Sequence, residues 1–206
     1  MANICNIEEF LLEKHVNLKE ELMARFELVK DNIIMTVINT EKNPQLLAQV
    51  PHNNKEDLSL IYKVLLNKNN RGVATITVSN EHLKLWDITV EELHELAVKN
   101  SKRLLPSCIN KMEPMYVITN LQYDNGASTI FYDDALERIS EMIGTDLYIM
   151  PSSIHEVIAV STDMGTPEVL SEMVRGVNSS MVSVEEQLSN NVYYYSAEKK
   201  NLTLAV

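Results

Sequence analysis

Three places in the sequence indicate β-hairpins, and they constrain the fold more than any other feature. In each, two segments rich in β-branched or aromatic residues flank a short polar turn. The predicted pairs are 115–123 with 127–132 around Asn125-Gly126, 146–150 with 154–160 around Pro151-Ser152-Ser153, and 191–197 with 202–206 around the turn 198–201. Because a hairpin pairs its strands antiparallel, the sequence predicts an α+β fold with mainly antiparallel sheets.

Three further strands are expected before these hairpins. The β-branched run from Ile33 to Ile38 predicts a strand at about 32–39, and residues 73–79 show the same composition. Residues 57–66 alternate imperfectly between apolar and polar side chains, which favours a half-buried strand over the competing helix.

Four to five helices are expected to pack on the sheets. They are predicted at about 6–28, 81–86, 89–105, 134–143 and 166–181. Thr89 and Glu92 form a capping-box pattern at the start of the third, and Gly144 follows the end of the fourth. The fifth opens with Thr166-Pro167-Glu168, and its apolar residues are expected to face inward: Val169, Leu170, Met173, Val174 and Val177.

Glycine is scarce, and this limits both the domain organisation and the kinds of binding loop that the chain can form. The five glycines are too widely spaced for a phosphate-binding loop of either common pattern. There is also no Gly/Ser-rich linker and no low-complexity tract. We therefore expect residues 1–206 to form a single compact domain, with two packed halves (1–112 and 113–206) as the alternative.

The net charge of −11 is concentrated in the second half of the chain. Residues 1–112 carry 15 acids and 14 bases, whereas residues 113–206 carry 14 acids and 4 bases. This balance argues against direct binding to nucleic acid, which needs clustered Lys and Arg. Two interpretations stay open: the acidic half keeps the protein soluble, or it meets a basic partner.

The sequence predicts a cytoplasmic protein without cofactors. No window reaches the roughly 18 apolar residues of a membrane helix. The first residues carry acids where a signal peptide has bases. Cys5 and Cys108 lie far apart, so two free thiols in a reducing compartment are expected.

Four carboxylates around the predicted helix 134–143 form a candidate binding site. Asp134, Glu137 and Glu141 share one helix face, and Asp133 precedes them. Such an acidic strip could bind a divalent cation or serve as general acid and base. The alternative is structural, with one aspartate capping the helix and the others solvated.

His155 and Glu156 form an alternative candidate site, on a predicted strand directly after a tight turn. Neither this pair nor His94-Glu95 has the second histidine four residues later that a helical zinc site requires. No metal site is therefore predicted, and no nucleophile motif accompanies the pair. The sequence leans against an enzyme.

Several segments together resemble a known protein family. They are VPHNNKEDLSLIYKVLL, ATITVSNEHLKLWDITVEELHELAVKNSKRLLP, LYIMPSSIHEVI and LSNNVYYYS. They are similar to a family of gut-bacterial proteins, often carried on mobile elements, that has no established activity. The resemblance covers roughly residues 30–206 and is most distinctive from His82 to Pro106 and from Leu147 to Val157. It implies an intracellular folded domain and transfers no catalytic residue.

Two hypotheses from different classes follow. The first is a non-enzymatic interaction protein whose acidic C-terminal half binds a basic protein or nucleoprotein complex. The mobile-element context implied by the resemblance makes an inhibitor of host defence, of the anti-CRISPR kind, one concrete version. The second is an enzyme with a dispersed site of His155, Glu156 and the Asp133-Asp134 carboxylates, dependent on a divalent metal. The lack of a catalytic motif favours the first.

Overall fold

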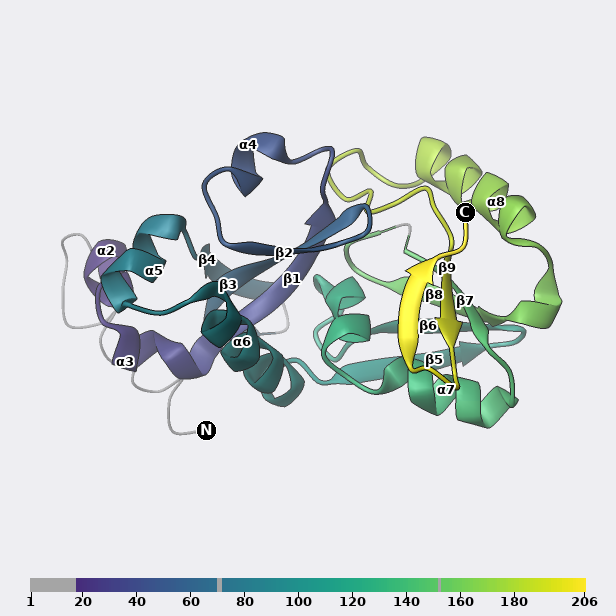
Figure 1. Ribbon diagram of the computed structural model, residues 1–206, viewed down its shortest axis with the longest axis horizontal. Helices are drawn as coiled ribbons and strands as arrows, with labels where there is room; N and C mark the ends of the chain where they lie inside the picture. The colour runs from purple at the N-terminus through teal and green to yellow at the C-terminus, as the bar shows by residue number, and fades with distance from the viewer. Residues whose placement is uncertain (1–17, 70–71, 152) are drawn as a thin grey trace.

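The protein is described here from a computed structural model that covers residues 18–69, 72–151 and 153–206. Within these residues the strands form two antiparallel sheets, one in each of two lobes (Figure 1). The predicted α+β fold with antiparallel sheets is therefore confirmed. The four-stranded sheet holds β1 (Ile33–Asn39), β2 (His52–Lys55), β3 (Leu58–Asn69) and β4 (Gly72–Thr77). The six-stranded sheet holds β5 (Ser107–Met112), β6 (Met115–Asn120), β7 (Leu147–Met150), β8 (Val157–Ser161), β9 (Tyr193–Ser196) and β10 (Asn201–Leu204).

Each lobe carries its own helices. Those of the N-terminal lobe are α2 (Leu18–Met23), α3 (Phe26–Val29), η1 (Lys30–Asn32), α4 (Pro44–Leu47), α5 (Asn80–Trp86) and α6 (Val90–Leu104). Those of the C-terminal lobe are η2 (Gly126–Phe131), α7 (Ala135–Ile143), η3 (Thr162–Met164) and α8 (Pro167–Ser180). The predicted helices near 81–86, 89–105, 134–143 and 166–181 are all present.

The predicted first helix, 6–28, is wrong where it can be compared with the structure. Its first residues, 6–17, lie outside the described part of the chain. The rest forms two short helices, α2 and α3, because Arg25 leaves the helical conformation with φ −108° and ψ 86°. Trp86 explains the packing at this point: its indole N–H donates to the carbonyl of Met23 at 2.6 Å, and its ring lies 5.4 Å from that of Phe26.

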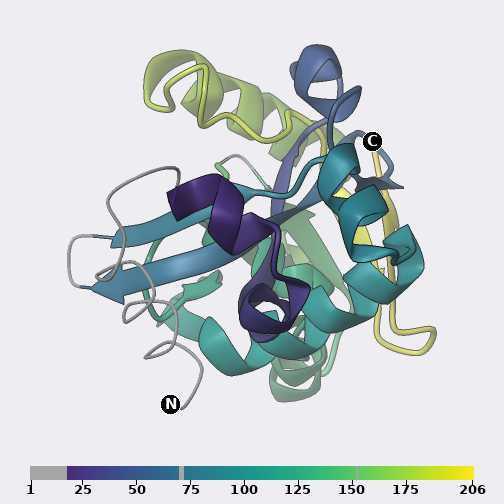
Figure 2. The ribbon, with the colours of Figure 1, turned by 90° about the vertical axis from the view of Figure 1, so that its left-hand side faces the viewer.

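Helices of the N-terminal lobe cover one face of the four-stranded sheet (Figure 2). The sheet contributes Ile33, Met35 and Tyr62 to the core, and α6 contributes Leu93 and Ala97. The period of two along β1 places Ile34 on the opposite face, in a smaller apolar cluster with Leu104. The helix α6 begins with the predicted capping box, in which Glu92 N–H donates to Thr89 Oγ1 at 3.2 Å and Thr89 N–H donates to Glu92 Oε2 at 2.8 Å.

The six-stranded sheet has the order β10-β9-β7-β8-β6-β5 and is covered on both faces. Leu147 and Ile149 of β7 face the main core, together with Ile139 of α7. Met150 faces the other way and packs with Leu170 of α8. The helices α7 and α8 therefore lie on opposite faces of this sheet (Figure 1).

Two of the three predicted hairpins are confirmed. The strands β7 and β8 pair antiparallel with Leu147 opposite Ser161, and β9 and β10 pair with Tyr193 opposite Leu204. The strand β8 begins only at Val157, so His155 and Glu156 lie in the connection before it and not on the strand. The hairpin β5–β6, with Ser107 opposite Asn120, was not predicted.

The hairpin predicted around Asn125-Gly126 is wrong. Residues 126–131 form the 3-10 helix η2, and β6, which ends at Asn120, pairs with β5 and β8 instead. A two-residue type I′ turn needs φ above zero at both central residues, and here only Asn125, at φ 51°, has it. Gly126 is required for space instead, because a Cβ there would lie 2.1 Å from Thr119 Oγ1 and 2.6 Å from the carbonyl oxygen of His155.

The two lobes share one apolar core and a polar junction. A single cluster of buried side chains includes Val64 of the first lobe and Ile118 of the second. Beside it, the carboxylate of Asp57 at the β2–β3 turn accepts hydrogen bonds from Ser189, Asn191 and Tyr193. The charge boundary at residue 112 falls at the end of β5, within the β5–β6 hairpin. The chain passes from the first sheet to the second before β5, so the charge boundary and the boundary between the sheets lie close together but do not coincide.

Candidate functional site

Asp133, the first residue of the predicted acidic strip, is a structural carboxylate. Its side chain is only 8% exposed. One oxygen accepts from the N–H of Ser107 at 3.2 Å and the other from the N–H of Asp134 at 2.8 Å, which ties the start of β5 to the start of α7. Burial alone would raise the pKa of Asp133, but these hydrogen bonds outweigh it and lower the pKa to about 2. The side chain is therefore committed to holding two elements together.

Two of the other strip residues, Asp134 and Glu137, form ion pairs. Asp134 lies 3.6 Å from Arg138 on the same helix, and Glu137 pairs with Lys200 from the β9–β10 turn. Glu141 is exposed one turn further along α7. The structure thus neutralises much of the charge that the strip shows in sequence, which makes it a weaker attractor for a basic partner than expected.

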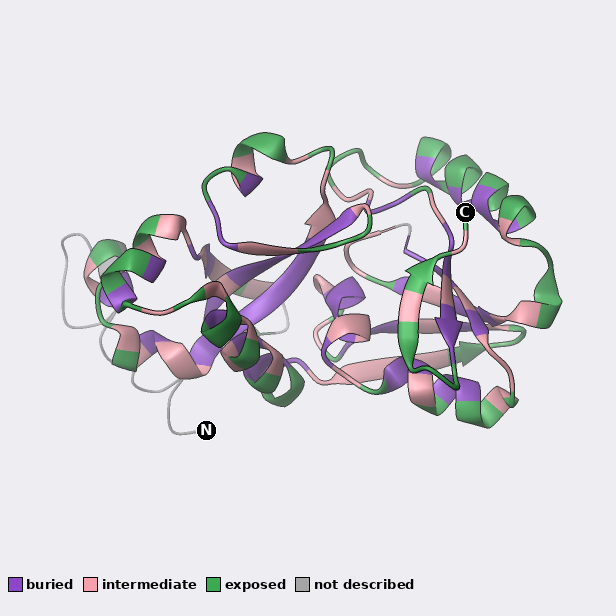
Figure 3. Cartoon of the chain, viewed as in Figure 1, coloured by how far each residue is buried: buried purple, intermediate pink, exposed green. Residues whose placement is uncertain are grey.

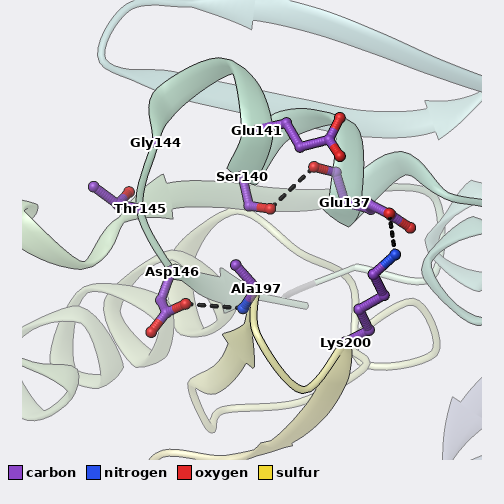
Figure 4. Close-up of a pocket in the computed structure, with 8 residues that line it drawn as sticks. All are labelled: Glu137, Ser140, Glu141, Gly144, Thr145, Asp146, Ala197 and Lys200. Carbon is purple, nitrogen blue, oxygen red and sulfur yellow. Dashed lines mark hydrogen bonds and ion pairs between the residues drawn. The ribbon is translucent and has the colours of Figure 1, made fainter.

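A hollow of about 470 Å³ opens between α7 and the β9–β10 turn, and two residues of the strip line it (Figure 4). Its walls are Glu137, Ser140, Glu141, Gly144, Thr145, Asp146, Ala197 and Lys200. Asp146 accepts from the N–H of Ala197 at 2.8 Å and from the hydroxyl of Tyr194, and this second bond lowers the pKa of Asp146. With three carboxylates and one lysine, the hollow favours a cationic group over an anion.

The alternative site residue His155 lies between two carboxylates. Its Nδ1 accepts from the N–H of Asn125 at 3.2 Å and lies 3.5 Å from Asp124. A neutral ring therefore carries its proton on Nε2, which is 3.5 Å from Glu186. Glu156, the other predicted member of this site, is exposed.

The groups predicted to form a dispersed active site have separate partners. His155 contacts Asp124, Asn125 and Glu186, whereas Asp133 and Asp134 contact Ser107, Lys102 and Arg138. In the described part of the chain, no three His, Cys, Asp or Glu side chains are arranged to hold a metal ion. The fold places the carboxylates of Asp124 and Glu186 beside His155. The predicted partners Asp133 and Asp134 make their contacts with other residues.

The largest feature that the sequence reasoning missed lies on α8. The prediction that five apolar residues of this helix face inward is only partly right. Leu170 and Val174 are buried against the six-stranded sheet. Three others face solvent, as the exposed outer side of the helix shows (Figure 3). The exposed fractions are 55% for Val169, 59% for Met173, 41% for Val177 and 82% for Met181, and we call these four residues the α8 stripe.

The spacing of the α8 stripe is the signal that would have revealed it. The four residues recur every fourth position and form an exposed apolar row beside the buried row of Leu170, Val174 and Asn178. A surface helix normally needs one apolar face, so two rows indicate one face for the sheet and one for something else. Acids accompany the stripe: residues 163–186 carry five acids against one base, Arg175.

The fold and this surface define an α+β protein with two antiparallel sheets and an exposed, acid-flanked apolar helix face. The model of a family of unknown function, DUF5688, matches residues 1–114 and 111–197. The chain therefore belongs to this family. Among curated proteins and among solved structures, none matches the chain. No helix in the described residues is long and apolar enough to cross a membrane.

Proposed function

We propose that this protein is a non-enzymatic interaction protein that binds a basic protein surface through the α8 stripe and the acids around it. The observation that carries this proposal is the exposure of the stripe. Exposed apolar side chains are common singly, but a row of three on one helix face, continued by Met181 directly after the helix, is typical of a binding surface. A methionine or valine gains about 1.5–3 kcal/mol when fully buried, and the stripe gains this only when a partner covers it.

The charges around the stripe indicate the sign of the charge that a partner surface should carry. Glu168 and Glu172 are exposed on α8 beside the stripe, and Glu185 is exposed beyond its end. A partner with apolar side chains ringed by Lys or Arg would complement both features. A second copy of the chain is disfavoured, because two-fold pairing through this face would bring two surfaces with the same excess of acids together.

The finer version of the proposal is an inhibitor of host defence carried on a mobile element. A nuclease complex that grips nucleic acid presents a basic channel, and an acidic protein can occupy it. The support for this version is the net charge of residues 113–206 together with the acid-flanked stripe. The protein would act in the cytoplasm by blocking a surface, without chemistry of its own.

The test compares capture of partners by matched variants. Wild-type protein, the double variant Met173→Ser/Met181→Ser and the control Met142→Ser are immobilised and exposed to lysate of the native host. Met142 is 63% exposed on α7, so its substitution matches the chemistry at another place. We expect a basic protein that wild type and Met142→Ser retain and the double variant loses.

The captured protein is then purified and its affinity measured between about 50 and 300 mM salt. We expect affinity to fall with salt and to fall at least tenfold in the double variant. Equal retention by all three proteins would show that the α8 stripe is not the docking surface. An affinity that does not change with salt concentration would contradict the electrostatic part of the proposal. Capture of the same chain as the partner would show self-association in place of binding to a basic protein.

An enzyme with a dispersed site is the alternative, and one observation favours it. His155 lies within 3.5 Å of two carboxylates, those of Asp124 and Glu186, which is an arrangement that general bases use. The proposal in this form keeps His155 as the base with Glu156 as a neighbouring acid. Its metal-dependent version requires these side chains to rearrange around the ion, because no three of them are arranged to hold a metal in the described residues. Elemental analysis of the purified protein tests it, with His155→Gln as comparison: metal uptake that this variant loses would support it, and no uptake would end the metal-dependent version.

A further inference from the structure

We propose that the cleft between the two lobes binds an extended, uncharged peptide segment of a partner protein, which adds a strand to the free edge of β10. The cleft has a volume of about 470 Å³, within the range of ligand sites. The β2–β3 hairpin forms one wall, and η2, α7 and the β9–β10 hairpin form the other (Figure 1). Its lining residues are Asn54, Lys55, Glu56, Ile130, Phe131, Leu136, Tyr193, Tyr195, Lys200, Asn201 and Leu202. This site is separate from the α8 stripe, and the inference does not rest on the proposed interaction function.

Edge strands border the cleft on both sides. Among the described strands, β10 pairs only with β9, and β2 pairs only with β3. In an antiparallel pair, alternate residues turn their backbone N–H and C=O away from the partner strand. Of the consecutive lining residues Asn54 and Lys55, and of Asn201 and Leu202, one in each pair therefore has backbone groups that its own ladder does not use. Hydrogen bonds to such an edge are a common way in which proteins bind extended peptides.

The edge of β10 lacks the features that usually prevent the addition of a strand. Natural edge strands carry charged side chains, prolines or bulges. The strand β10 has neither charge nor proline, and its register with β9 runs without a shift. At the opposite edge of the same sheet, β5 carries Lys111, which pairs with Glu113 at 2.7 Å. One edge of the sheet is therefore protected, and the edge beside the cleft is open.

The apolar lining matches the side chains of an added strand. Leu202 is half-buried, and Leu204, on the same face of β10, is 38% exposed. Ile130 and Phe131 of η2 are half-buried, and Leu136 of α7 is buried. Alternate side chains of a strand point to one face, so we expect every second residue of the peptide to be apolar. Burial of these side chains against the lining supplies the free energy of binding.

The charges of the cleft cancel, and this favours an uncharged segment. The ammonium group of Lys200 is paired with Glu137, and Lys55 is offset by Glu56 in the same lining. A charged side chain that entered the cleft would lose water without gaining an ionic partner. Backbone amides are polar without net charge, so an extended peptide satisfies the polar edge of β10 at no such cost.

The walls of the cleft are held in register by the polar junction beside it. Asp57 directly follows the lining residues of the β2–β3 turn and accepts from Ser189 at 2.6 Å and from Asn191 at 3.0 Å. It also accepts from the hydroxyl of Tyr193, whose side chain lines the cleft. A site whose walls are tied together is preorganised, so a ligand does not have to order the two lobes on binding.

Peptide selection tests the proposal. Random peptides of about six residues, the usual length of a strand, are displayed on phage and selected on the full chain. Enriched peptides are synthesised with blocked ends, and their affinity is measured by fluorescence anisotropy. We expect uncharged peptides with apolar residues at alternate positions, and at least tenfold weaker binding to Leu202→Lys, which puts a charge into the apolar lining. Thr203→Lys is the matched control and should keep the affinity, because Thr203 is exposed on the opposite face of the same strand.

N-methylation of the peptide distinguishes strand addition from binding through side chains alone. A methyl group on one backbone nitrogen removes one donor and leaves every side chain unchanged. We expect a loss of at least tenfold at every second position, where the N–H turns toward β10, and a loss of less than about twofold at the positions between. In hydrogen exchange, the bound peptide should slow exchange at residues 201–204. Equal effects of N-methylation at all positions, or no effect at any, would refute strand addition.

A second variant keeps the test valid if Leu202→Lys is unstable. Asn54 is exposed on the other wall, so Asn54→Trp fills the cleft without disturbing the core and should also lose the peptides. No peptide enriched on wild type over both cleft variants would overturn the proposal, and a loss only in Met173→Ser/Met181→Ser would move the binding to the α8 stripe. A wild-type dimer that Leu202→Lys converts to a monomer would assign the edge to a second copy of the chain instead.

Discussion

The hydroxyl of Ser189 donates a 2.6 Å hydrogen bond to the carboxylate of Asp57, which lies 132 residues earlier in the chain. This contact joins the β2–β3 turn of the N-terminal lobe to the segment that leads into β9. Two more donors, Asn191 and Tyr193, converge on the same carboxylate. Burial and the neighbouring Asp57 charge raise the pKa of Tyr193, so its phenol stays a donor at physiological pH.

Replacing Asp57 by alanine should therefore weaken the attachment of the two lobes. Three donors would lose their acceptor, and we expect a loss of about 2–3 kcal/mol in the free energy of unfolding. Urea denaturation measures this loss, and hydrogen exchange should show faster exchange at residues 189–193. The control Glu198→Ala removes an exposed acid and should change stability by less than about 0.5 kcal/mol. Equal stabilities for the two variants would contradict the role given to Asp57.

Asp133 should make stability depend on pH in the acid range. Its pKa is about 2 in the folded protein and near 3.9 in the unfolded chain. A depressed folded pKa gives stability that is present above the unfolded value and is lost as the pH falls from about 4 to about 2. Asp133→Asn should cost about 2 kcal/mol at pH 7 and progressively less below pH 4. Asp134→Asn, at a half-exposed neighbour, is the comparison, and a pH-independent cost at Asp133 would count against this account.

Gly126 and Gly176 should respond in opposite directions to alanine. A Cβ at Gly126 would meet Thr119 Oγ1 at 2.1 Å and two backbone atoms at 2.6 Å, so Gly126→Ala should cost about 3 kcal/mol or more. A Cβ at Gly176 meets nothing within 4 Å on the exposed side of α8, so Gly176→Ala should stabilise by about 0.5–1 kcal/mol. Thermal unfolding distinguishes the two, and a tolerated Gly126→Ala would refute the packing described around His155.

The two apolar rows of α8 should also differ in their effect on folding. Leu170→Ala removes a buried side chain and should cost about 2–4 kcal/mol. Met173→Ala removes an exposed one and should change the free energy of unfolding by less than about 0.5 kcal/mol. Chemical denaturation of the two variants checks this difference. A large loss at Met173 would show that the stripe supports the fold instead of being free for a partner.

Much of the local structure could be predicted because its causes lie within a few residues. The capping box of Thr89 and Glu92 starts α6, and Gly144, at φ 79°, ends α7. Pro167 stands in the first turn of α8, and the last two hairpins pair as expected. Each of these depends on backbone propensities that neighbouring residues impose on one another.

The candidate sites could not be predicted in the same way, because they depend on contacts between distant segments. In the sequence, Asp133 belongs to an acidic strip. In the fold its carboxylate accepts hydrogen bonds from the N–H groups of Ser107 and Asp134 and is buried. The pair Asn125-Gly126 is typical of a hairpin turn. In the fold, a glycine is needed at 126 because a Cβ would clash with Thr119. His155 gains its carboxylate partners from residues 124 and 186, one well before it in the chain and one well after.

The sequence by itself determined four of the helices, the last two hairpins and the concentration of charge in residues 113–206, because composition and short-range pattern govern these properties. Tertiary structure alone decided which charges are neutralised, as Glu137 is by Lys200, and which apolar row of α8 stays in solvent. The physical reason is that burial and pairing depend on which surfaces meet, and a helix with two apolar rows cannot specify from its own residues which row the sheet will cover.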